Sequence, residues 1–598
     1  MSRVTTRAIA CAALLLAWGC GGGHPCKTAR DCDAAQRCVA GACAAPSGPG
    51  ALGEACGDCA AGLACSSPAQ GFAGGACSRA CGAGCGPSAG CADLRGTTAD
   101  ARLCAPLCAS SRDCRKDQVC CGAQGDVCLP AALCGPPVST VACAPPSLVS
   151  GGTVVAAQPP AGSCGRPIQP SAAPAAQVQA FGVHRVGDAV SFEVPAGTGS
   201  FSVFEQATPA ASTARIVLRD GSSDDNSAVP RDLTGPDGAV IFDDLQQPAD
   251  PTAAQLFYPG GSPGIGSLTL PNTSASLSRD SDAGGLPTGA WKLTVGDFAY
   301  ECTLAGNCAD GGSSAGQYDV TVVTRPGAPS PQGAGALDLA FYIVGASPFS
   351  AASAARSPQA RRMVQTLGDI YQQAGLCLRT ATFYDVPAWA RAAYGTSIDA
   401  DRTGPCDALD QMFLLSQPGN ALHFFLVQSI TSSKNGGGQV VGIDGTIPGP
   451  ASVSGTIHSG AAVSIADLGS ASAQACGGGI DVAFCAADRV AYIAAHEGGH
   501  YLGLFHLTES DGQAFDPLVD TPTCRCDRCA PASSQARCGL GSDPPLVGAA
   551  DCASAQQPCA GGQYLMFWQL DPQVSQAQIS PQQAQLMRLS PLVQGAGP

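Results

Sequence analysis

The sequence predicts a multidomain chain with three folded parts: disulfide-rich modules, a β-sandwich and an α+β domain. Three observations support this. Twenty cysteines gather between residues 26 and 164, runs with alternating apolar residues lie between about 178 and 326, and strands alternate with amphipathic helices in 335–598. A length of 598 residues also favours several domains over one.

Composition narrows the functional classes. The net charge is −15, which argues against a nucleic-acid partner, because phosphate backbones are bound by basic surfaces. Lysine occurs only four times while Ala and Gly are abundant, a pattern typical of a GC-rich bacterial genome.

Residues 1–20 are predicted to be an export signal. Arg3 and Arg7 precede an apolar run, residues 8–18, that is too short to anchor a chain across a bilayer. A small residue then precedes Cys20, which resembles the cleavage site of bacterial lipoproteins. We therefore expect a lipid on Cys20 and a membrane anchor at the outer membrane or cell surface. Plain secretion is the alternative.

Residues 21–165 form the cysteine-rich part. A C-x5-C-x5-C pattern that begins at Cys26 recurs at Cys108, so an internal repeat is present. The region has few large apolar residues and must be cross-linked to hold a fold. Behind an export signal, disulfides are the favoured interpretation, and zinc binding by pairs such as Cys56 and Cys59 is the alternative.

A Pro/Ala-rich link near 145–177 leads to the predicted β-sandwich, residues 178–326. Expected strands lie at 189–194, 200–204, 214–218, 291–295 and 318–322. Cys302 and Cys308 are expected to close a loop. Asp224 and Asp225 are interpreted as a solvated acidic turn, with calcium binding as the alternative. The Gly-Leu-Pro-Thr-Gly-Ala-Trp stretch at 285–291 resembles the P-domain of secreted proprotein convertases, which is a jelly-roll sandwich.

The C-terminal domain, residues 335–598, begins after a Pro/Gly linker. The pattern predicts a strand at 337–344, a helix at 355–376, strands at 378–384 and 422–427, edge segments at 439–448 and 460–465, and a helix at 487–502. His423 is expected to be a packed core histidine. Predicted disulfides are Cys377 with Cys406 and Cys476 with Cys485. The six cysteines from 524 to 559 are expected to form three more, with a second structural metal as the alternative.

One stretch of that last helix carries the chemistry, since it follows an H-E-x-x-H-x-x-G-x-x-H pattern. His496 and His500 are four residues apart and share one helix face, so both imidazoles can reach one Zn²⁺. Glu497 can polarise a water on that metal and carry its proton. Gly503 can end the helix in a sharp turn that returns His506 as the third ligand. Three protein ligands and an open position describe a catalytic zinc.

This motif resembles that of the metzincin metallopeptidases, and more narrowly that of pappalysins, the family of pregnancy-associated plasma protein-A. The acidic stretch ending in Asp-Thr-Pro at 516–522 fits that family, and 564–568 is the candidate for its Met-turn. The resemblance implies a metzincin fold for residues 335–598, with Met566 beneath the metal. It also implies that Asp516 and Asp520 are candidate calcium ligands, although loop capping by these two side chains is the alternative.

The Met-turn candidate departs from the family's usual form at two places. Asn is commoner where Tyr564 stands, and Tyr is commoner where Trp568 stands. These differences bear on any tyrosine role in stabilising the transition state, and they leave the zinc ligands unchanged.

The sequence therefore predicts an exported, surface-anchored zinc metalloendopeptidase that hydrolyses peptide bonds in a peptide or protein substrate with a Glu-activated water. Two alternatives stay open. One is a surface adhesin or scaffold lipoprotein with a latent or degenerate peptidase domain. The other is a zinc hydrolase that acts on a non-peptide bond.

Overall fold

A computed structural model gives the fold of the chain. Within residues 1–142 it describes 37–39, 42–44, 49–56, 58–66, 75–81, 85, 88–93, 102–108, 114–115, 118–121 and 127–129. Beyond that it describes 143–159, 169–170, 176–208, 215–217, 223–225, 227–228, 230–243, 250–258, 265–298, 300–302, 308–310, 317–327, 334–401, 406–432, 440–468, 476, 482–538, 545–553, 559–572, 574 and 576–595. The predicted signal and Cys20 lie outside these residues. Within them, no helix is long and apolar enough to cross a membrane.

Residues 1–137 form one compact unit, which is described by itself. It consists of short paired strands: β1 (Arg37–Val39) with β2 (Ala42–Ala44), β3 (Pro49–Gly50) with β4 (Asp58–Cys59), β5 (Ala64–Ser66) with β6 (Ala76–Ser78), β7 (Ala89–Asp93) with β8 (Arg102–Pro106), and β9 (Val119–Cys121) with β10 (Val127–Leu129). Among its described residues, the buried apolar side chains are mostly Ala and Cys. The disulfides described here are Cys56–Cys65, Cys59–Cys77, Cys81–Cys91, Cys85–Cys104 and Cys114–Cys128. Cross-links therefore take the place of a large core, and the predicted disulfide-rich region is confirmed.

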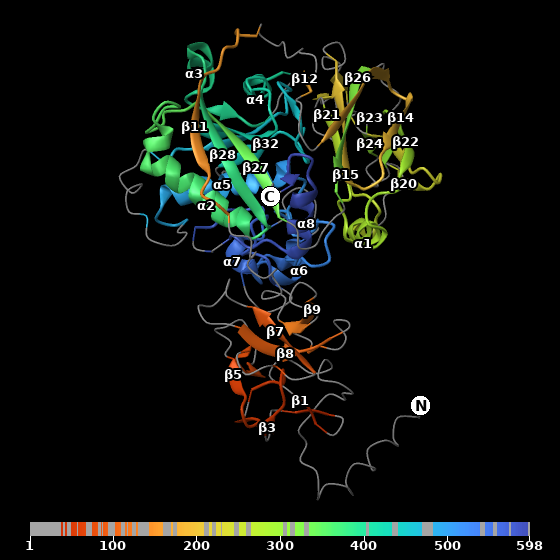
Figure 1. Cartoon of the computed structure of the whole chain (residues 1–598), viewed down its shortest axis with the longest axis vertical. Coiled ribbons are helices and arrows are strands. Elements are labelled where there is room, and N and C mark those ends of the chain that lie inside the picture. The colour runs from red at the N-terminus through yellow and green to blue at the C-terminus, as the bar shows by residue number, and fades with distance from the viewer. Residues whose placement is uncertain are drawn as a thin grey trace, which may run out of the picture. The chain divides into compact units, whose positions relative to one another are not determined.

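Residues 138–598 form the second unit, which contains a sandwich and a larger sheet with helices (Figure 1). The larger sheet has the order β11-β28-β27-β30-β34-β32, and β35 pairs with the start of β27. Neighbours are parallel except β32 and β35, which run antiparallel to their partners. The strands are β11 (Ser147–Thr153), β27 (Gly335–Ile343), β28 (Leu376–Asp385), β30 (Ala421–Val427), β32 (Gly442–Asp444), β34 (Ala461–Ser464) and β35 (Gln594–Gly595). Strands β27, β28, β30, β32 and β34 thus lie where the sequence predicts strands or edge segments.

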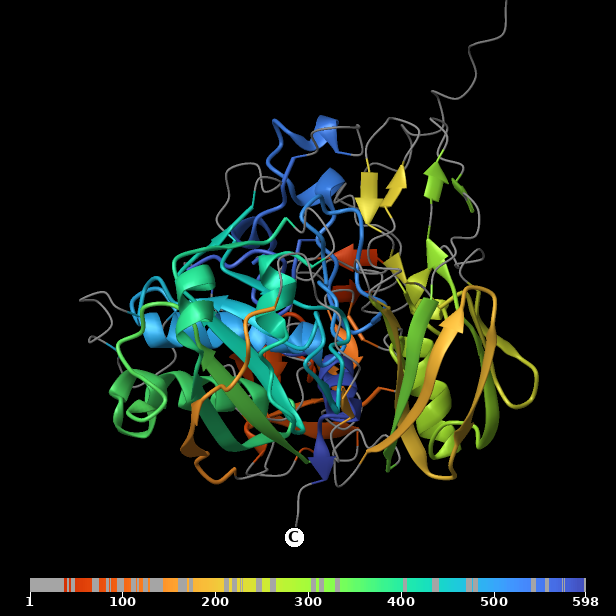
Figure 2. The ribbon, with the colours of Figure 1, turned by 90° about the horizontal axis from the view of Figure 1, so that it is seen from above.

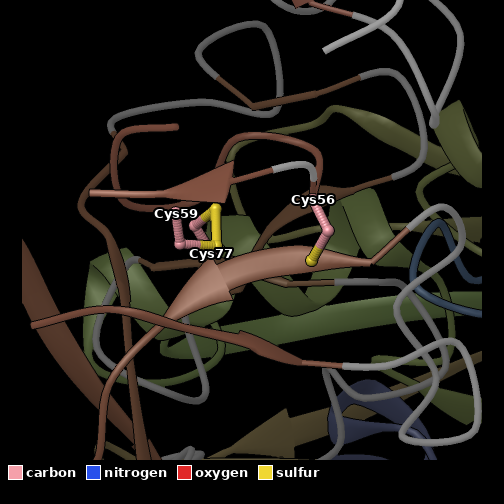
Figure 3. Close-up of side chains that lie close together, drawn as sticks. All are labelled: Cys56, Cys59 and Cys77. Atoms are coloured by element: carbon pink, nitrogen blue, oxygen red, sulfur yellow. A yellow bond between two sulfur atoms is a disulfide. The ribbon is translucent and has the colours of Figure 1, made fainter. Parts of the chain in front are cut away.

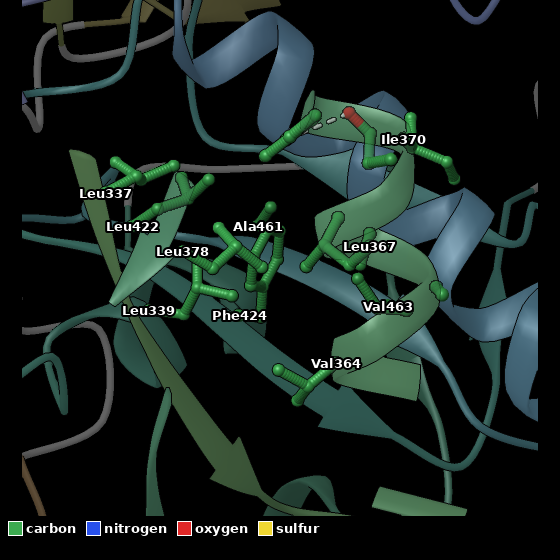
Figure 4. Close-up of a cluster of buried hydrophobic side chains, with 14 of the residues drawn as sticks. Leu337, Leu339, Val364, Leu367, Ile370, Leu378, Leu422, Phe424, Ala461 and Val463 are labelled. Atoms are coloured by element: carbon green, nitrogen blue, oxygen red, sulfur yellow. Dashed lines mark hydrogen bonds between the residues drawn. The ribbon is translucent and has the colours of Figure 1, made fainter. Parts of the chain in front are cut away.

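Helices cover both faces of this sheet. Helices α2 (Pro358–Gln372) and α5 (Ala486–Tyr501) pack on one face, and α3 (Ala388–Tyr394) and α4 (Ala408–Phe413) on the other. Figure 4 shows Val364 and Leu367 of α2 directed toward strand side chains such as Leu378 and Phe424, and Ile370 belongs to the same buried cluster. Helix α2 is shorter than predicted because the Ser357 hydroxyl accepts a hydrogen bond from the N–H of Ala360 and so caps its start.

An ion pair joins the two helices on the first face. The buried carboxylate of Asp488, in the first turn of α5, accepts two hydrogen bonds from the Arg362 guanidinium at 2.6 and 2.7 Å, and one from the Thr366 hydroxyl at 2.6 Å. Two parallel hydrogen bonds between a guanidinium and a carboxylate fix the relative orientation of the two groups and strengthen the ion pair. It sets the register between α2 and α5, and α5 carries the predicted metal ligands.

The N-terminal edge of the sheet corrects the predicted domain limits. Strand β11 pairs in parallel with β28, and Cys143 is bonded to Cys377. The segment near 145–153 is therefore part of the sheet rather than a link, and the cysteine-rich unit ends before the predicted limit of 165. The predicted pair Cys377 with Cys406 is wrong for the same reason, since Cys377 already has a partner; Cys406 is also disulfide-bonded.

The other disulfide predictions in this domain are confirmed. Cys476 is bonded to Cys485. The six cysteines of the loop-rich C-terminal region form three disulfides: Cys524–Cys552, Cys526–Cys538 and Cys529–Cys559. A metal on that cluster is thereby excluded, because a disulfide sulfur is not a thiolate ligand. Two short helices, α6 (Cys526–Cys529) and α7 (Ala549–Cys552), belong to this region, and α8 (Pro581–Leu589) follows it.

Two four-stranded sheets form the sandwich, in the orders β13-β26-β15-β21 and β14-β22-β19-β20. Figure 2 shows them face to face. The strands are β13 (Gln177–Arg185), β14 (Ala189–Val194), β15 (Thr198–Ala207), β19 (Asp232–Thr234), β20 (Val240–Asp243), β21 (Ile265–Leu270), β22 (Gly289–Thr294) and β26 (Gln317–Pro326). Phe192 and Trp291 from one sheet meet Phe201 from the other edge to face, at 5.2 and 5.1 Å between ring centroids. This aromatic contact ties the sheets together. A P-domain-like form of the sandwich stays a prediction.

Helix α1 (Ser274–Ala283) and the 3-10 turn η8 (Pro251–Ala253) belong to the sandwich. The remaining strands form short pairs: β12 (Gln169–Pro170) with β33 (Val453–Ser454), β16 (Arg215–Val217) with β17 (Ser223–Asp225), β18 (Ser227–Ala228) with β23 (Asp297–Phe298), β24 (Tyr300–Cys302) with β25 (Cys308–Asp310), and β29 (Ile398–Asp399) with β31 (Ile430–Thr431). Two further 3-10 turns are η9 (Ala354–Arg356) and η11 (Gln535–Arg537). Cys302 lies directly opposite Cys308, while the side chains of both, and those of Asp224 and Asp225, lie outside the described residues.

Candidate metal centre

Helix α5 brings two histidines and the glutamate into the interior. His496, Glu497 and His500 are 8%, 7% and 4% exposed, although all three are polar. The helix is buried along its length because it packs between α2 and the strands β30, β34 and β32. Polar side chains buried to this degree need partners of their own.

The two glycines inside α5 have a packing reason. A Cβ on Gly498 would lie 2.2 Å from the Tyr371 hydroxyl and 2.9 Å from Leu422. A Cβ on Gly499 would lie 2.5 Å from the sulfur of Met566. A glycine pair costs about 1 kcal/mol per residue in a helix interior, and here it allows α5 to approach two neighbours closely.

The turn after α5 is the one that the sequence predicts. Gly503 has a φ of +101°, which side-chain-bearing residues rarely adopt. The N–H of Gly503 bonds to the carbonyl of His500 at 2.8 Å, and the N–H of Leu504 bonds to the carbonyl of Gly499 at 2.9 Å. These bonds close the helix end and reverse the chain toward His506.

Three imidazoles meet at one point. The Nε2 atom of His506 lies 3.3 Å from Nε2 of His496 and 3.1 Å from Nε2 of His500. Three nitrogens at this spacing can all face a single small cation. In the part of the chain that the structure describes, this is the one cluster of three candidate ligands that contains histidine.

The opposite nitrogen of each ring is anchored. Nδ1 of His496 lies 2.7 Å from the carbonyl oxygen of Leu565, and Nδ1 of His500 lies 2.7 Å from that of Leu504. A carbonyl only accepts hydrogen bonds, so both Nδ1 atoms carry the proton and both Nε2 atoms present lone pairs to the cluster. Such partners fix the ring orientation that a metal ligand needs.

Glu509 supplies the third anchor. Both of its carboxylate oxygens lie 3.1 Å from Nδ1 of His506. The motif does not predict a role for Glu509. The signal that could have identified it is its position, since it is one of only six Glu in the chain and stands three residues after His506.

Electrostatics favour neutral imidazoles in the cluster. Burial first, and then the neighbouring His506, lower the pKa of His496 to about 3, and burial likewise holds the pKa of His500 well below its usual value. Neutral imidazole is the form that binds metals. The lone pairs on Nε2 of His496 and of His500 face the Nε2 atom of His506, so all three nitrogens are directed at one point. The donor set therefore fits a metal ion, and three nitrogens without a thiolate fit zinc.

Glu497 lies beside the edge strand β32. A Cβ on Gly442 would lie 2.3 Å from its Oε1, so only glycine leaves room for the carboxylate here. Burial, and then the nearby Asp444 carboxylate, raise the pKa of Glu497 well above its usual value, while a hydrogen bond from the Asp444 backbone lowers it. A carboxylate with a raised pKa is a stronger proton acceptor.

The turn at 564–567 lies under the cluster. Met566 is fully buried, and the N–H of Phe567 bonds to the carbonyl of Tyr564 at 3.2 Å. The neighbouring Leu565 carbonyl is the one that anchors His496. The indole N–H of Trp568 donates to the carbonyl of Val547 at 2.7 Å, so that polar group is already in use.

Asp516 and Asp520 act as caps in the structure. The two oxygens of Asp520 accept from the Ser580 hydroxyl and the Gln582 N–H, both at 2.8 Å, at the start of α8. Asp516 accepts from the Thr521 hydroxyl at 2.5 Å. Burial raises the pKa of Asp520 to about 6 and that of Asp516 well above its usual value. These contacts are those of the capping alternative, and calcium binding stays a prediction.

The cysteine clusters of the N-terminal unit are cross-links. Figure 3 shows the Cys59–Cys77 bond beside Cys56, and Cys56 is itself bonded to Cys65. These sulfurs therefore cannot serve as thiolate ligands. His423, by contrast with the three clustered histidines, packs in the sheet as predicted, with Nδ1 3.0 Å from the Tyr342 hydroxyl.

Comparison with known proteins adds no assignment: no protein-family model matches the chain, and no curated protein is significantly similar to it.

Proposed function

We propose that residues 335–598 form a zinc-dependent endopeptidase of the metzincin type, closest in its motif to the pappalysins. The observation that carries the proposal is the convergence of three imidazoles beside a buried glutamate: Nε2 of His496 and Nε2 of His500 lie 3.3 and 3.1 Å from Nε2 of His506. His496, His500 and His506 would hold the ion. Three protein ligands leave a fourth position open, as a catalytic zinc requires.

When bound, zinc would act as a Lewis acid toward a water molecule and toward the carbonyl of the substrate. Glu497 would then accept the proton of the attacking water on a carboxylate oxygen and donate it to the nitrogen of the leaving amine. Its raised pKa supports this role, because a raised pKa makes a carboxylate a stronger proton acceptor. The carbonyls of Leu565 and Leu504 and the carboxylate of Glu509 would keep the three rings aimed at the metal.

A peptide substrate is supported by the sheet edge. Strand β32 is the last strand of the sheet in the described chain, and its Gly442 lies against Glu497. An extended peptide that paired with this edge would present its carbonyl groups next to the glutamate. An open strand edge beside Glu497 favours hydrolysis of a peptide bond over hydrolysis of a non-peptide bond.

We further propose that the protein is exported and anchored by a lipid on Cys20. The disulfides of both units support an oxidising compartment. Replacing Cys20 by Ser should release the protein from the membrane fraction, which fractionation of the cells measures. Retention of Cys20→Ser in the membranes would contradict the anchor.

The test of the enzyme uses the full chain with a mixed peptide library. Cleavage should require zinc, stop under chelation, and be lost in Glu497→Gln while the variant still binds one zinc per chain. Equal cleavage by Glu497→Gln would refute the mechanism. Bound zinc without cleavage of any peptide would favour the adhesin or scaffold alternative with a latent domain.

A further inference from the structure

The outer face of one sandwich sheet is packed directly on the C-terminal domain through small hydroxyl side chains. Ser200, Ser202, Ser267 and Thr269 are 1%, 1%, 2% and 9% exposed. The Ser267 hydroxyl donates to the carbonyl of Pro448 at 2.6 Å, and the Ser200 hydroxyl donates to that of Leu589. Buried and satisfied hydroxyls indicate a permanent contact rather than a loose one.

This contact reaches the turn that carries the third histidine. The ring of Phe257, from the sandwich, meets the ring of Phe505 edge to face, with 5.1 Å between centroids and 90° between planes. Phe505 directly precedes His506. Next to it, a Cβ on Gly503 would lie 3.6 Å from the methyl group of Thr269 in β21. Phe257 therefore contacts the turn between α5 and His506, and Thr269 lies next to it.

Phe257 is itself held in place. The side chain of Asn272, which is fully buried, accepts from the N–H of Phe257 at 3.0 Å and donates to its carbonyl at 2.7 Å. These two bonds fix the backbone of Phe257 from both sides. A ring on such a fixed backbone is a rigid support for Phe505.

The sandwich also contacts the far end of the same loop. The N–H of Ser274 bonds to the carbonyl of Pro517 at 3.0 Å, and the Ser274 hydroxyl accepts from the N–H of Val519 at 2.8 Å. The segment from Gly503 to Val519 contains His506 and Glu509, so the sandwich touches it before and after the ligand and its anchor.

We propose that the sandwich is a structural part of the metal centre, and that Phe257 is a positioning residue for His506. This inference rests on the proposed function, in which His506 is a zinc ligand. It means that residues 335–598 alone lack part of the support for their third ligand. Contacts that orient metal ligands are typically worth about 10–100-fold in metal affinity.

The test measures Zn²⁺ affinity of the full chain by competition with a chromogenic chelator. Phe257→Ala should bind Zn²⁺ about 10–100-fold more weakly than the wild type. Phe192→Leu is the matched control, because Phe192 makes the same kind of edge-to-face contact inside the sandwich, with Phe201 at 5.2 Å. That control should loosen the sandwich core and leave Zn²⁺ affinity unchanged.

A double-mutant cycle keeps the proposal falsifiable. Phe257→Ala and Phe505→Ala act on one contact, so the double variant should lose less Zn²⁺ affinity than the two losses added together. Additive losses would overturn the proposal, as would wild-type affinity in Phe257→Ala or an equal loss in Phe192→Leu. If Phe257→Ala does not fold, Phe257→Leu replaces it in the same cycle. Failure of the wild type to bind Zn²⁺ would instead refute the proposed function.

Discussion

The candidate metal centre has a helix half, His496 and His500, and a loop half, His506 with Glu509, and the two halves are positioned in different ways. His496 and His500 lie in α5, deeply buried, and backbone carbonyls anchor their rings. His506 lies beyond the helix with its side chain 23% exposed, and its anchor Glu509 is 48% exposed. The geometry of α5 places the first two on one helix face, whereas the third depends on the turn after α5, on Glu509 and on the sandwich contact through Phe505. Variants of the two halves should therefore fail in different ways, the helix half in folding and the loop half in metal binding.

The largest effect is expected in the helix half. Gly498→Ala puts a Cβ 2.2 Å from the Tyr371 hydroxyl, and overpacking of a rigid core costs about 1–3 kcal/mol, here toward the upper end. Gly368→Ala, in α2, is the matched control, because its Cβ meets nothing closer than 3.5 Å and it should stabilise by up to about 1 kcal/mol. Thermal unfolding of the zinc-free proteins measures both. Equal stability of the two variants would contradict this account of the helix glycines.

A smaller effect is expected from the anchor of the loop half. Glu509→Gln keeps the shape and removes the charge that faces Nδ1 of His506. Zn²⁺ affinity should fall about 10–100-fold, and the unfolding temperature of the zinc-free protein should stay close to that of the wild type. Chelator competition and thermal unfolding measure the two quantities. A variant that loses stability and keeps Zn²⁺ affinity would show that Glu509 acts on the fold.

The smallest effect concerns a histidine outside the centre. Burial lowers the pKa of His423 to about 4, below the ordinary value of about 6.5 that it regains on unfolding. Its neutral form therefore contributes stability above pH 6.5 that is lost progressively as the pH falls toward 4. Between pH 7 and about 5.5, the wild type should lose roughly 1 kcal/mol more than His423→Gln. Urea unfolding at both pH values measures the difference, and parallel losses would contradict the burial argument.

The sequence predicts those features of the fold that depend on neighbouring residues in the chain. The strands β27, β28 and β30 and the helix α5 lie within two or three residues of their predicted limits, because apolar periodicity records burial in the chain itself. Gly503 has the left-handed conformation that its place in the motif predicts. The three disulfides of the C-terminal region follow from an even number of cysteines in a chain that is predicted to be exported.

Contacts between residues that are far apart in the sequence could not be predicted. Strand β11 lies in a Pro/Ala-rich region that reads as a linker, and Cys143 is 234 residues from Cys377. The contact of Phe257 with Phe505 joins two domains that the sequence describes separately. No periodicity or spacing in the sequence encodes such pairs, because they depend on how complete strands and helices pack against one another in the fold. The loop half of the centre is supported by contacts of this kind.

The central claim is that His496, His500 and His506 hold one zinc ion. X-ray absorption at the zinc edge, on the full chain loaded with one equivalent of Zn²⁺, tests it most directly. We predict three imidazole nitrogens at about 2.0–2.1 Å and one oxygen neighbour. Sulfur neighbours at about 2.3 Å, or fewer than three imidazoles, would contradict the account.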